Sequence, residues 1–78
     1  GAGRAEMLAR LAELDASVLA AGRARLDADA VADLAREAEQ ELQAFRGRMA
    51  ADAYERSKAA CFDRLVRERL KLPTLALD

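Results

Sequence analysis

The chain has 78 residues with 13 Lys or Arg, 14 Asp or Glu and a formal net charge of −1 at pH 7, which gives the whole chain no bias towards nucleic acid or an anionic membrane. It contains no His and a single Cys, Cys61, so the usual general acid–base residue, a zinc site within one chain and an intrachain disulfide are excluded. A single domain of this size buries only about 60% of its unfolded-chain surface, and we therefore expect a partner or a second copy to supply further stability.

Helices rather than strands are expected throughout, because Ala, Leu and charged residues dominate the sequence and Ile is absent. Residues 1–3, Gly-Ala-Gly, are interpreted as a cloning remnant, and residues 4–78 as a single helical domain. A first helix is predicted over residues 4–21, with Gly22 as the residue that ends it. Its apolar stripe is expected to pack into a core, and it consists of Met7, Leu11, Leu14 and Val18, widened by Leu8 and Leu19.

A second helix is predicted over residues 28–46. Asp27 has the position of an N-cap, since its carboxylate can accept the free N–H groups of the first turn. Leu26 and Val31 have the spacing of a hydrophobic staple, and Gly47 is expected to adopt a left-handed conformation after the helix. One face carries the apolar residues that we expect in the core, namely Val31, Leu34, Ala38, Leu42 and Phe45.

A third helix is predicted over residues 51–71, with Asp52 as the nearest capping residue and Pro73 as the residue that ends it. One arc of this helix carries the side chains that are expected to be buried, namely Tyr54, Cys61, Phe62, Leu65 and Val66. The tail around Pro73 is apolar and extended. We expect Leu75 and Leu77 in this tail to cover one end of a bundle, or alternatively to bind a partner.

The predicted fold is all-α, a three-helix bundle of up-down-up topology with an extended apolar C-terminal tail. Short connections between the helices favour antiparallel neighbours. The alternative is a hairpin of the helices at 4–21 and 28–46, from which the helix at 51–71 is swapped into a second copy. In both cases the apolar stripes are thin and rich in Ala, which favours completion of the core in a homodimer.

Charge is divided unevenly along the chain, because residues 1–45 carry five basic and nine acidic side chains and residues 46–71 carry eight basic and four acidic ones. Opposite charges can attract each other within one chain or between chains. An acidic ladder is interpreted as a solvated face or as a surface that contacts the basic side chains of the helix at 51–71, and it consists of Asp29, Asp33, Glu37 and Glu41. A basic face is a candidate for binding a partner, and it consists of Arg56, Arg64, Arg67 and Lys71.

The sequence offers few groups for catalysis. It has no Gly-rich phosphate loop, Cys61 is expected to be a buried and inert thiol, and we predict no catalytic residue, metal site or cofactor. The predicted function is therefore a non-enzymatic helical module for protein–protein interaction or oligomerisation, and the alternative is a small regulator that places the basic face on nucleic acid. We find no membrane-spanning stretch and no signal peptide, and an unpaired Cys fits the cytoplasm.

Overall fold

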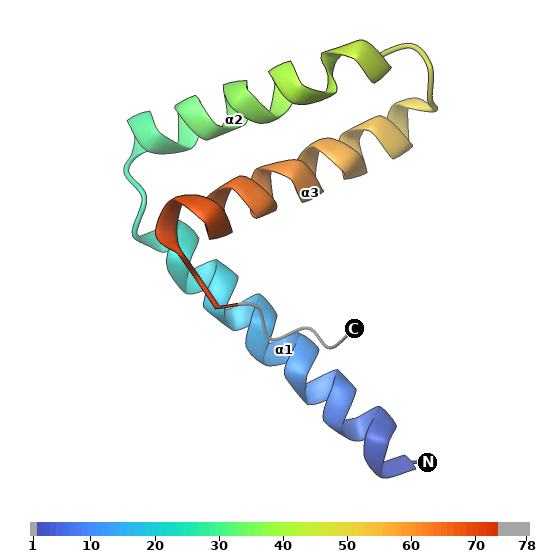
Figure 1. Cartoon of the computed structure of the whole chain (residues 1–78), viewed down its shortest axis with the longest axis vertical. Helices are drawn as coiled ribbons and strands as arrows, with labels where there is room; N and C mark the ends of the chain where they lie inside the picture. Colours follow the sequence, from blue (N-terminus) through green and yellow to red (C-terminus); the bar gives the residue numbers. More distant parts are fainter. Residues whose placement is uncertain (1, 74–78) are drawn as a thin grey trace.

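The computed structural model describes residues 2–73, and these residues form three α-helices and one short 3-10 helix (Figure 1). Helix α1 spans Ala2–Ala24, α2 spans Ala28–Leu42, the 3-10 helix η1 spans Gln43–Phe45, and α3 spans Ala51–Leu70. The described residues contain no β-strand. The predicted all-helical class is therefore confirmed, with three helices packed together.

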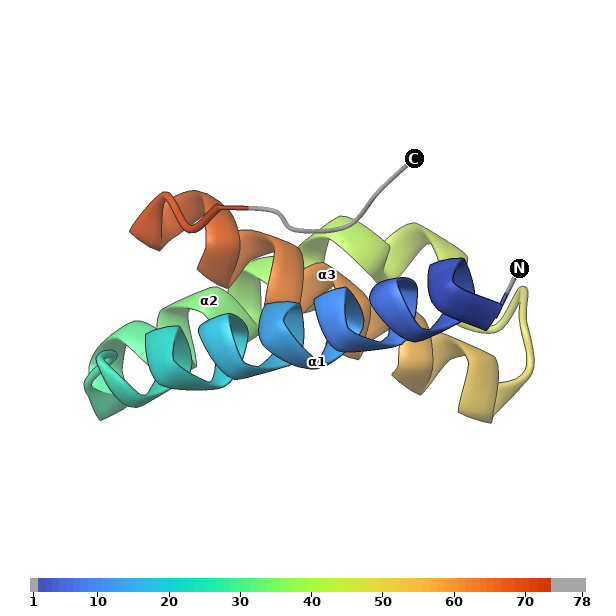
Figure 2. The same ribbon diagram turned by 90° about the horizontal axis from the view of Figure 1, so that it is seen from below.

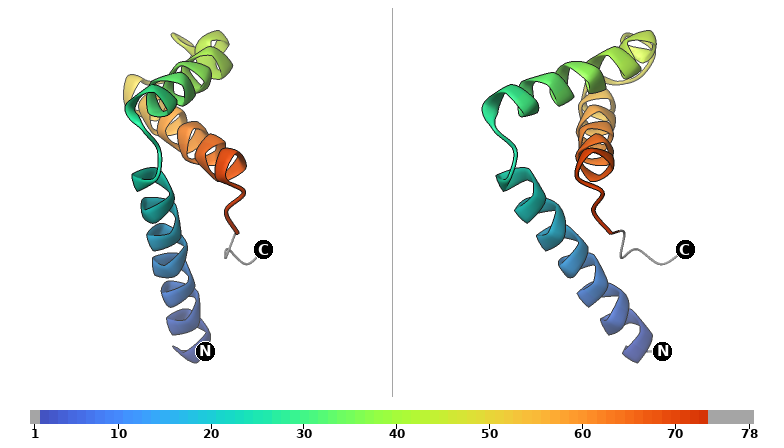
Figure 3. Two further views of the ribbon diagram at one scale, coloured as in Figure 1. Left: turned by 90° about the vertical axis from the view of Figure 1, so that its left-hand side faces the viewer. Right: turned by 60° about the vertical axis from the view of Figure 1, so that its left-hand side comes forward.

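Helices α2 and α3 lie side by side and antiparallel, whereas α1 meets them only near its C-terminal end (Figures 1 and 2). From that end α1 runs away from the pair, so that its N-terminus lies far from both other helices (Figure 3). The structure does not confirm the up-down-up arrangement of the predicted bundle. Helices α2 and α3 form the pair that most resembles a helical hairpin, whereas the alternative prediction placed the hairpin at the first two helices.

Local signals explain where α2 begins and where the chain turns after it. The backbone N–H of Ala30 donates to Asp27 Oδ1 at 2.8 Å, which confirms Asp27 as the N-cap. Gly47 has a φ of +85°, as expected for a residue that turns the chain in a left-handed conformation. The helix is shorter than the predicted 28–46, because its last turn tightens into η1, where Arg46 N–H donates to the Gln43 carbonyl.

The start of α3 is capped differently from the prediction. Ala50 occupies the N-cap position, and no side chain there accepts a backbone N–H. Asp52 lies inside the first turn, where the dipole of the helix favours a negative charge, and its carboxylate pairs with Arg56 at 3.0 Å. The expectation that Asp52 caps this helix is therefore wrong.

The role predicted for Gly22 is also wrong, because α1 continues through it to Ala24 and Gly22 is buried. A Cβ atom at this position would lie 2.7 Å from a terminal methyl carbon of Leu72 and 3.2 Å from one of Leu70. Gly22 therefore serves close packing between α1 and the end of α3 rather than termination of the helix. The sequence pattern does not distinguish these two uses of glycine.

The C-terminal end of α3 provides the leucines that pack on Gly22. Lys71 adopts a left-handed conformation with a φ of 54°, so the helix ends before Pro73 and one residue earlier than predicted. Leu72 N–H donates to the Arg67 carbonyl at 3.0 Å, and Lys71 N–H donates to that of Glu68 at 3.4 Å. This is the Schellman pattern of helix termination, and it turns the chain towards α1.

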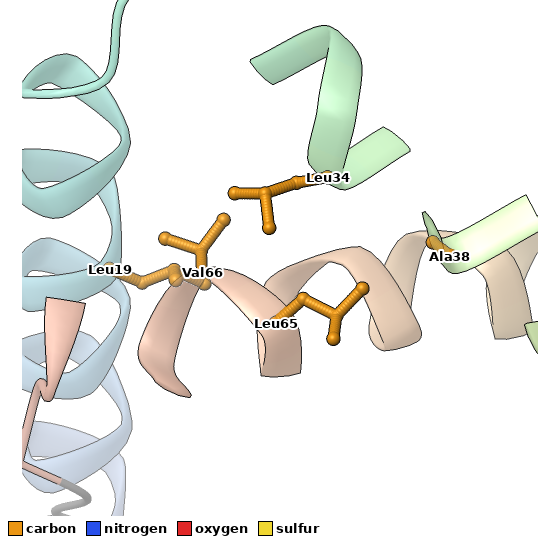
Figure 4. Packing of buried hydrophobic residues seen from close by; sticks show 5 residues of the cluster. All are labelled: Leu19, Leu34, Ala38, Leu65 and Val66. Carbon is orange, nitrogen blue, oxygen red and sulfur yellow. The ribbon is translucent and has the colours of Figure 1, made fainter. Parts of the chain in front are cut away.

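The core is small and lies where the three helices meet (Figure 4). It consists of Leu19 from α1, Leu34 and Ala38 from α2, and Leu65 and Val66 from α3. Burial of all five residues was predicted from their helical spacing and is confirmed. Burial was also predicted for further residues that are in fact exposed, namely Met7, Leu8, Leu14, Val31 and Phe45.

Tyr54 is buried apart from this core, near the start of α3. Its ring lies 5.7 Å from the Lys58 ammonium, which is within the range of a cation–π contact. Its hydroxyl oxygen is hidden and has no hydrogen-bond partner among the described residues. The position of the ring therefore depends on apolar packing and on Lys58, not on the hydroxyl.

Candidate interaction surface

Besides the close approach at Gly22, three side-chain contacts hold the C-terminal half of α1 against α3. Leu19 is buried in the core, and Arg23 pairs with Asp63 at 3.1 Å. The guanidinium of Arg67 donates two parallel hydrogen bonds to the two carboxylate oxygens of Asp15, at 2.8 and 2.7 Å, and both side chains are only 21% exposed. Bidentate pairs of this kind fix geometry as well as distance. The direction in which α1 leaves α3 is therefore well defined.

The N-terminal half of α1 carries apolar side chains that no other described helix covers. Met7 is 49% exposed, Leu8 38% and Leu14 54%. With Leu11, which is partly buried, they form what we call the free stripe. At about 100° per residue, Leu8 and Leu11 lie within about 40° of the direction of Gly22, which faces α3 further along the helix, whereas Met7 and Leu14 lie about 60° and 80° to one side of it. The packed face of α1 thus continues beyond the end of its contact with α3.

A hollow of about 340 Å³ lies between α2 and α3, next to the end of α1. Its floor consists of small or apolar side chains, namely Ala35, Ala38, Ala59 and Phe62, and we call it the alanine groove. Its charged lining residues are Arg23, Glu39, Glu55, Lys58 and Asp63. Small side chains allow a helix axis to approach closely, so this groove has the character of a seat for another helix. Ala38 was predicted to lie in the core, whereas nothing in the sequence pattern indicated that Ala35 and Ala59 share a surface with it.

Most of the predicted basic face is engaged within the chain. Arg56 pairs with Asp52 on its own helix, and Arg67 pairs with Asp15 of α1. Arg64 pairs with Glu68 and with Glu41 of α2, both at 2.8 Å. Lys71 is exposed in the turn that ends α3. Three of the four basic side chains therefore already have carboxylate partners, which reduces the charge that they can offer to a phosphate.

The four residues of the predicted acidic ladder are exposed along α2, and one of them reaches α3. Glu41 contacts Arg64, as described above. Asp33 pairs with Arg36 of its own helix, and Asp29 lies in the first turn of α2, where its charge is favourable. Glu37 makes no contact with α3 among the described interactions. Leu75 and Leu77, predicted to dock or to bind a partner, lie outside the described residues.

Cys61 forms a small polar cluster with Glu41 and Arg64. Its thiol donates to Glu41 Oε2 at 3.1 Å, and Arg64 Nη2 lies 3.6 Å from its sulfur. Burial, followed by the hydrogen bond to Glu41, raises the pKa of the Cys61 thiol. A thiol in this state is a poor nucleophile. Cys61 is only partly buried, however, so the expectation of full burial is wrong.

The same cluster affects the pKa values of its two other members. The hydrogen bond from the Cys61 thiol holds the pKa of the Glu41 carboxyl below its ordinary value of 4.5, together with the charge of Arg64, although desolvation opposes this effect. Hydrogen bonds to Glu68 and to Cys61 raise the pKa of the Arg64 guanidinium. All three groups therefore keep their neutral-pH protonation states over a wide pH range, which suits a structural contact between α2 and α3.

Comparison with known proteins adds no assignment to these surfaces, because no protein-family model, curated protein or solved structure gives a significant match to the chain. Among residues 2–73, no three Cys, Asp or Glu side chains are grouped closely enough to hold a metal ion. None of the helices in the same range has both the length and the apolar character needed to cross a membrane. The free stripe and the alanine groove are the features on which a function can be argued.

Proposed function

We propose that the protein is a non-enzymatic self-association module that forms a homodimer through the free stripe of α1. The observation that supports this proposal is the exposure of Met7, Leu8 and Leu14 on the N-terminal half of α1, whereas Leu19 on its C-terminal half is buried in the core. Exposed apolar surface of this kind is favourable to bury, at about 25 cal/mol per Å². Clustered apolar residues on an otherwise charged helix are typical of a protein–protein contact.

A dimer also offers a route to the up-down-up arrangement that a single described chain does not adopt. In that arrangement, the N-terminal half of a first helix lies along an α2–α3 pair. The alternative of a swapped helix at 51–71 has weaker support. In the described chain, α3 already packs on α2 through Leu34, Ala38 and Leu65, whereas α1 has an uncovered face.

The proposal places the protein in the cytoplasm, where thiols stay reduced. A single Cys that is protonated and hydrogen-bonded to Glu41 is compatible with such a compartment. The nucleic-acid alternative has less support, because Arg56, Arg64 and Arg67 are engaged in ion pairs. Binding of duplex DNA or RNA that weakens steeply with salt would favour that alternative.

The test of self-association is the molar mass in solution, measured by light scattering over a wide range of concentrations at low and high salt. We expect the wild-type chain to approach twice the 8.5 kDa of one copy as concentration rises. Leu14→Glu places a charge in the free stripe and should keep the chain monomeric. Ala16→Glu is the matched control, because it adds the same charge at an exposed position on the far side of α1 and should leave the dimer intact. A wild-type chain that is monomeric at every concentration would contradict the proposal.

A further inference from the structure

Two unfilled surfaces of this chain are kept apart by the way in which α1 is attached. The free stripe lies on the N-terminal half of α1, and the alanine groove lies between α2 and α3. Helix α1 is uninterrupted from Ala2 to Ala24, so its two halves cannot change direction separately. The bidentate Asp15–Arg67 pair and the close approach of Leu72 to Gly22 fix its C-terminal half on α3. The free stripe therefore cannot reach the alanine groove of its own chain without loss of these contacts.

The charges that border the two surfaces are complementary. On α1, Arg10 flanks the free stripe beside Leu14, and Arg4 lies on the arc of Leu8 and Leu11. Glu6 lies on the same edge as Arg10, because both line one hollow with Met7 and Leu11, whereas Glu13 lies towards the opposite face of the helix. On the groove, Glu39 and Glu55 border the apolar floor, and Lys58 is paired with Glu55. Within residues 2–73 neither Arg10 nor Glu39 takes part in an ion pair. The stripe is therefore flanked by two basic side chains and one acidic one. On the groove, Arg23 is paired with Asp63 and Lys58 with Glu55, so that Glu39 contributes the remaining negative charge.

We propose that the alanine groove of one copy is the seat for the free stripe of a second copy, with Arg10 on the side of Glu39. The occupant is a second copy of this chain because the stripe and the groove match in apolar character and in the sign of their edges. The exchange is reciprocal, so that each copy supplies one stripe and one groove and the assembly closes as a twofold dimer. The proposal rests on the self-association proposed above and names the surface that receives α1.

Cysteine pairing tests the seat directly. In a Cys61→Ser background, one chain carries Leu14→Cys and the other carries Ala59→Cys, and the two are mixed and oxidised. We expect disulfide-linked dimers that contain one chain of each kind, and few linked dimers from either chain alone. Linked dimers of the Leu14→Cys chain alone would show that α1 packs on α1, which overturns the groove as the seat and leaves self-association standing.

The same cysteines separate exchange from closure within one chain. A chain with both Leu14→Cys and Ala59→Cys should yield linked dimers when it is oxidised at a concentration at which the dimer predominates. A linked monomer under those conditions would show that α1 closes on its own groove, which overturns the proposal.

Charge reversal provides a second test that does not depend on the exact position of the cysteines. Arg10→Glu and Glu39→Arg should each weaken the dimer at low salt by about threefold to thirtyfold in Kd, because each dimer contains the pair twice. The two reversals combined in one chain should restore most of the affinity. Glu37→Arg is the control, because it makes the same charge change on α2 about 200° around the helix from Glu39 and should leave the Kd unchanged.

The outcomes distinguish the seat from self-association itself. If Leu14→Glu abolishes the dimer but reversal at Arg10 and Glu39 has the same effect as the control, the alanine groove is not the seat, although the chain still self-associates. If the wild-type chain is monomeric, both proposals fail.

Discussion

The α2–α3 pair and the N-terminal half of α1 carry similar apolar patterns but have different surroundings. In the pair, Leu34 is 2% exposed and Ala38 is fully buried, because α3 runs antiparallel to α2 along its length. In α1, Leu14 is 54% exposed, because α3 lies against the other end of that helix. The comparison shows that an amphipathic pattern identifies the face that requires cover, whereas the packing geometry decides whether the same chain provides it.

The largest expected difference between the two regions is in the cost of truncating a leucine. Leu34→Ala should lower the free energy of unfolding by about 3 kcal/mol, because it leaves a cavity among the three helices. Leu14→Ala should cost less than about 0.5 kcal/mol under conditions in which the chain is monomeric, because its side chain is half exposed. Urea unfolding at low protein concentration measures both values. Equal costs would mean that the free stripe is packed within one chain.

The attachment of α1 offers a second contrast, between two glycines of the same helix. Gly22→Val should destabilise the fold by about 2 kcal/mol, because the added side chain would meet Leu72 and Leu70. Gly3→Val is the control, since a Cβ atom at Gly3 meets no other atom within 4 Å. Thermal unfolding of the two variants should therefore differ clearly. A tolerated Gly22→Val would show that the contact between α1 and the end of α3 is loose.

The ion pair that orients α1 should contribute somewhat less. Arg67→Met keeps most of the apolar stem but removes both hydrogen bonds to Asp15, and we expect a loss of about 1.5 kcal/mol. Arg69→Met is the matched control, because Arg69 is exposed on the same helix and forms no ion pair among the described residues. Amide hydrogen exchange should show faster opening of α1 in the first variant only, with α2 little affected. Equal amide exchange of α1 in both variants would show that the Asp15–Arg67 pair does not hold this helix in place.

The smallest expected effect is the pH dependence of the contact between α2 and α3. The pKa of Cys61 is raised above its ordinary value of 9.0, so its contribution to stability is complete below pH 9.0 and is lost as pH rises through the folded-state pKa. The pKa of Glu41 is lowered, so its contribution is present above pH 4.5 and is lost as pH falls through the folded-state pKa.

Urea midpoints measured across pH check both limbs of this dependence. Cys61→Ser should remove the part of the alkaline decline that belongs to the thiol, and Glu41→Gln should flatten the acidic limb. Arg64 faces the same cluster, and its raised pKa keeps it charged throughout the alkaline limb, so the difference between wild type and Cys61→Ser isolates the thiol. If the urea midpoints of wild type and Cys61→Ser changed with pH in the same way, the raised pKa of Cys61 would be contradicted.

The sequence was sufficient for features that depend on neighbouring residues. Asp27 caps α2, Gly47 turns the chain, and Leu34 lies in the core, because capping, turn conformation and helical spacing are all local. The direction of α1 was not predictable, because it depends on a pair 52 positions apart, Asp15 and Arg67, and on a close approach at Gly22 that resembles a helix end in the sequence.

Only one of the two surfaces of the candidate site, the free stripe, could be identified from the sequence. Its stripe was found as an apolar pattern but was assigned to the core, because helical spacing does not report which neighbour is present. The groove was missed, because Ala35 and Ala59 come from helices that are distant in the sequence and show their common surface only when α2 and α3 pack together. Among the charged residues, a contact between the acidic ladder and the basic face was one of the two readings of the sequence. The structure forms it at Glu41 and Arg64, whereas the other three residues of the ladder form no ion pair with α3 among the described residues.

The central claim is that residues 3–14 of α1 are uncovered in one chain and become covered in a dimer. Amide hydrogen exchange of the wild-type chain at a low and a high protein concentration tests this claim most directly. We predict that protection of residues 3–14 rises with concentration, whereas protection around Leu34 and Val66 is already high at the lower concentration and changes little. Equal protection of residues 3–14 at both concentrations, in a chain whose molar mass does increase, would contradict the account.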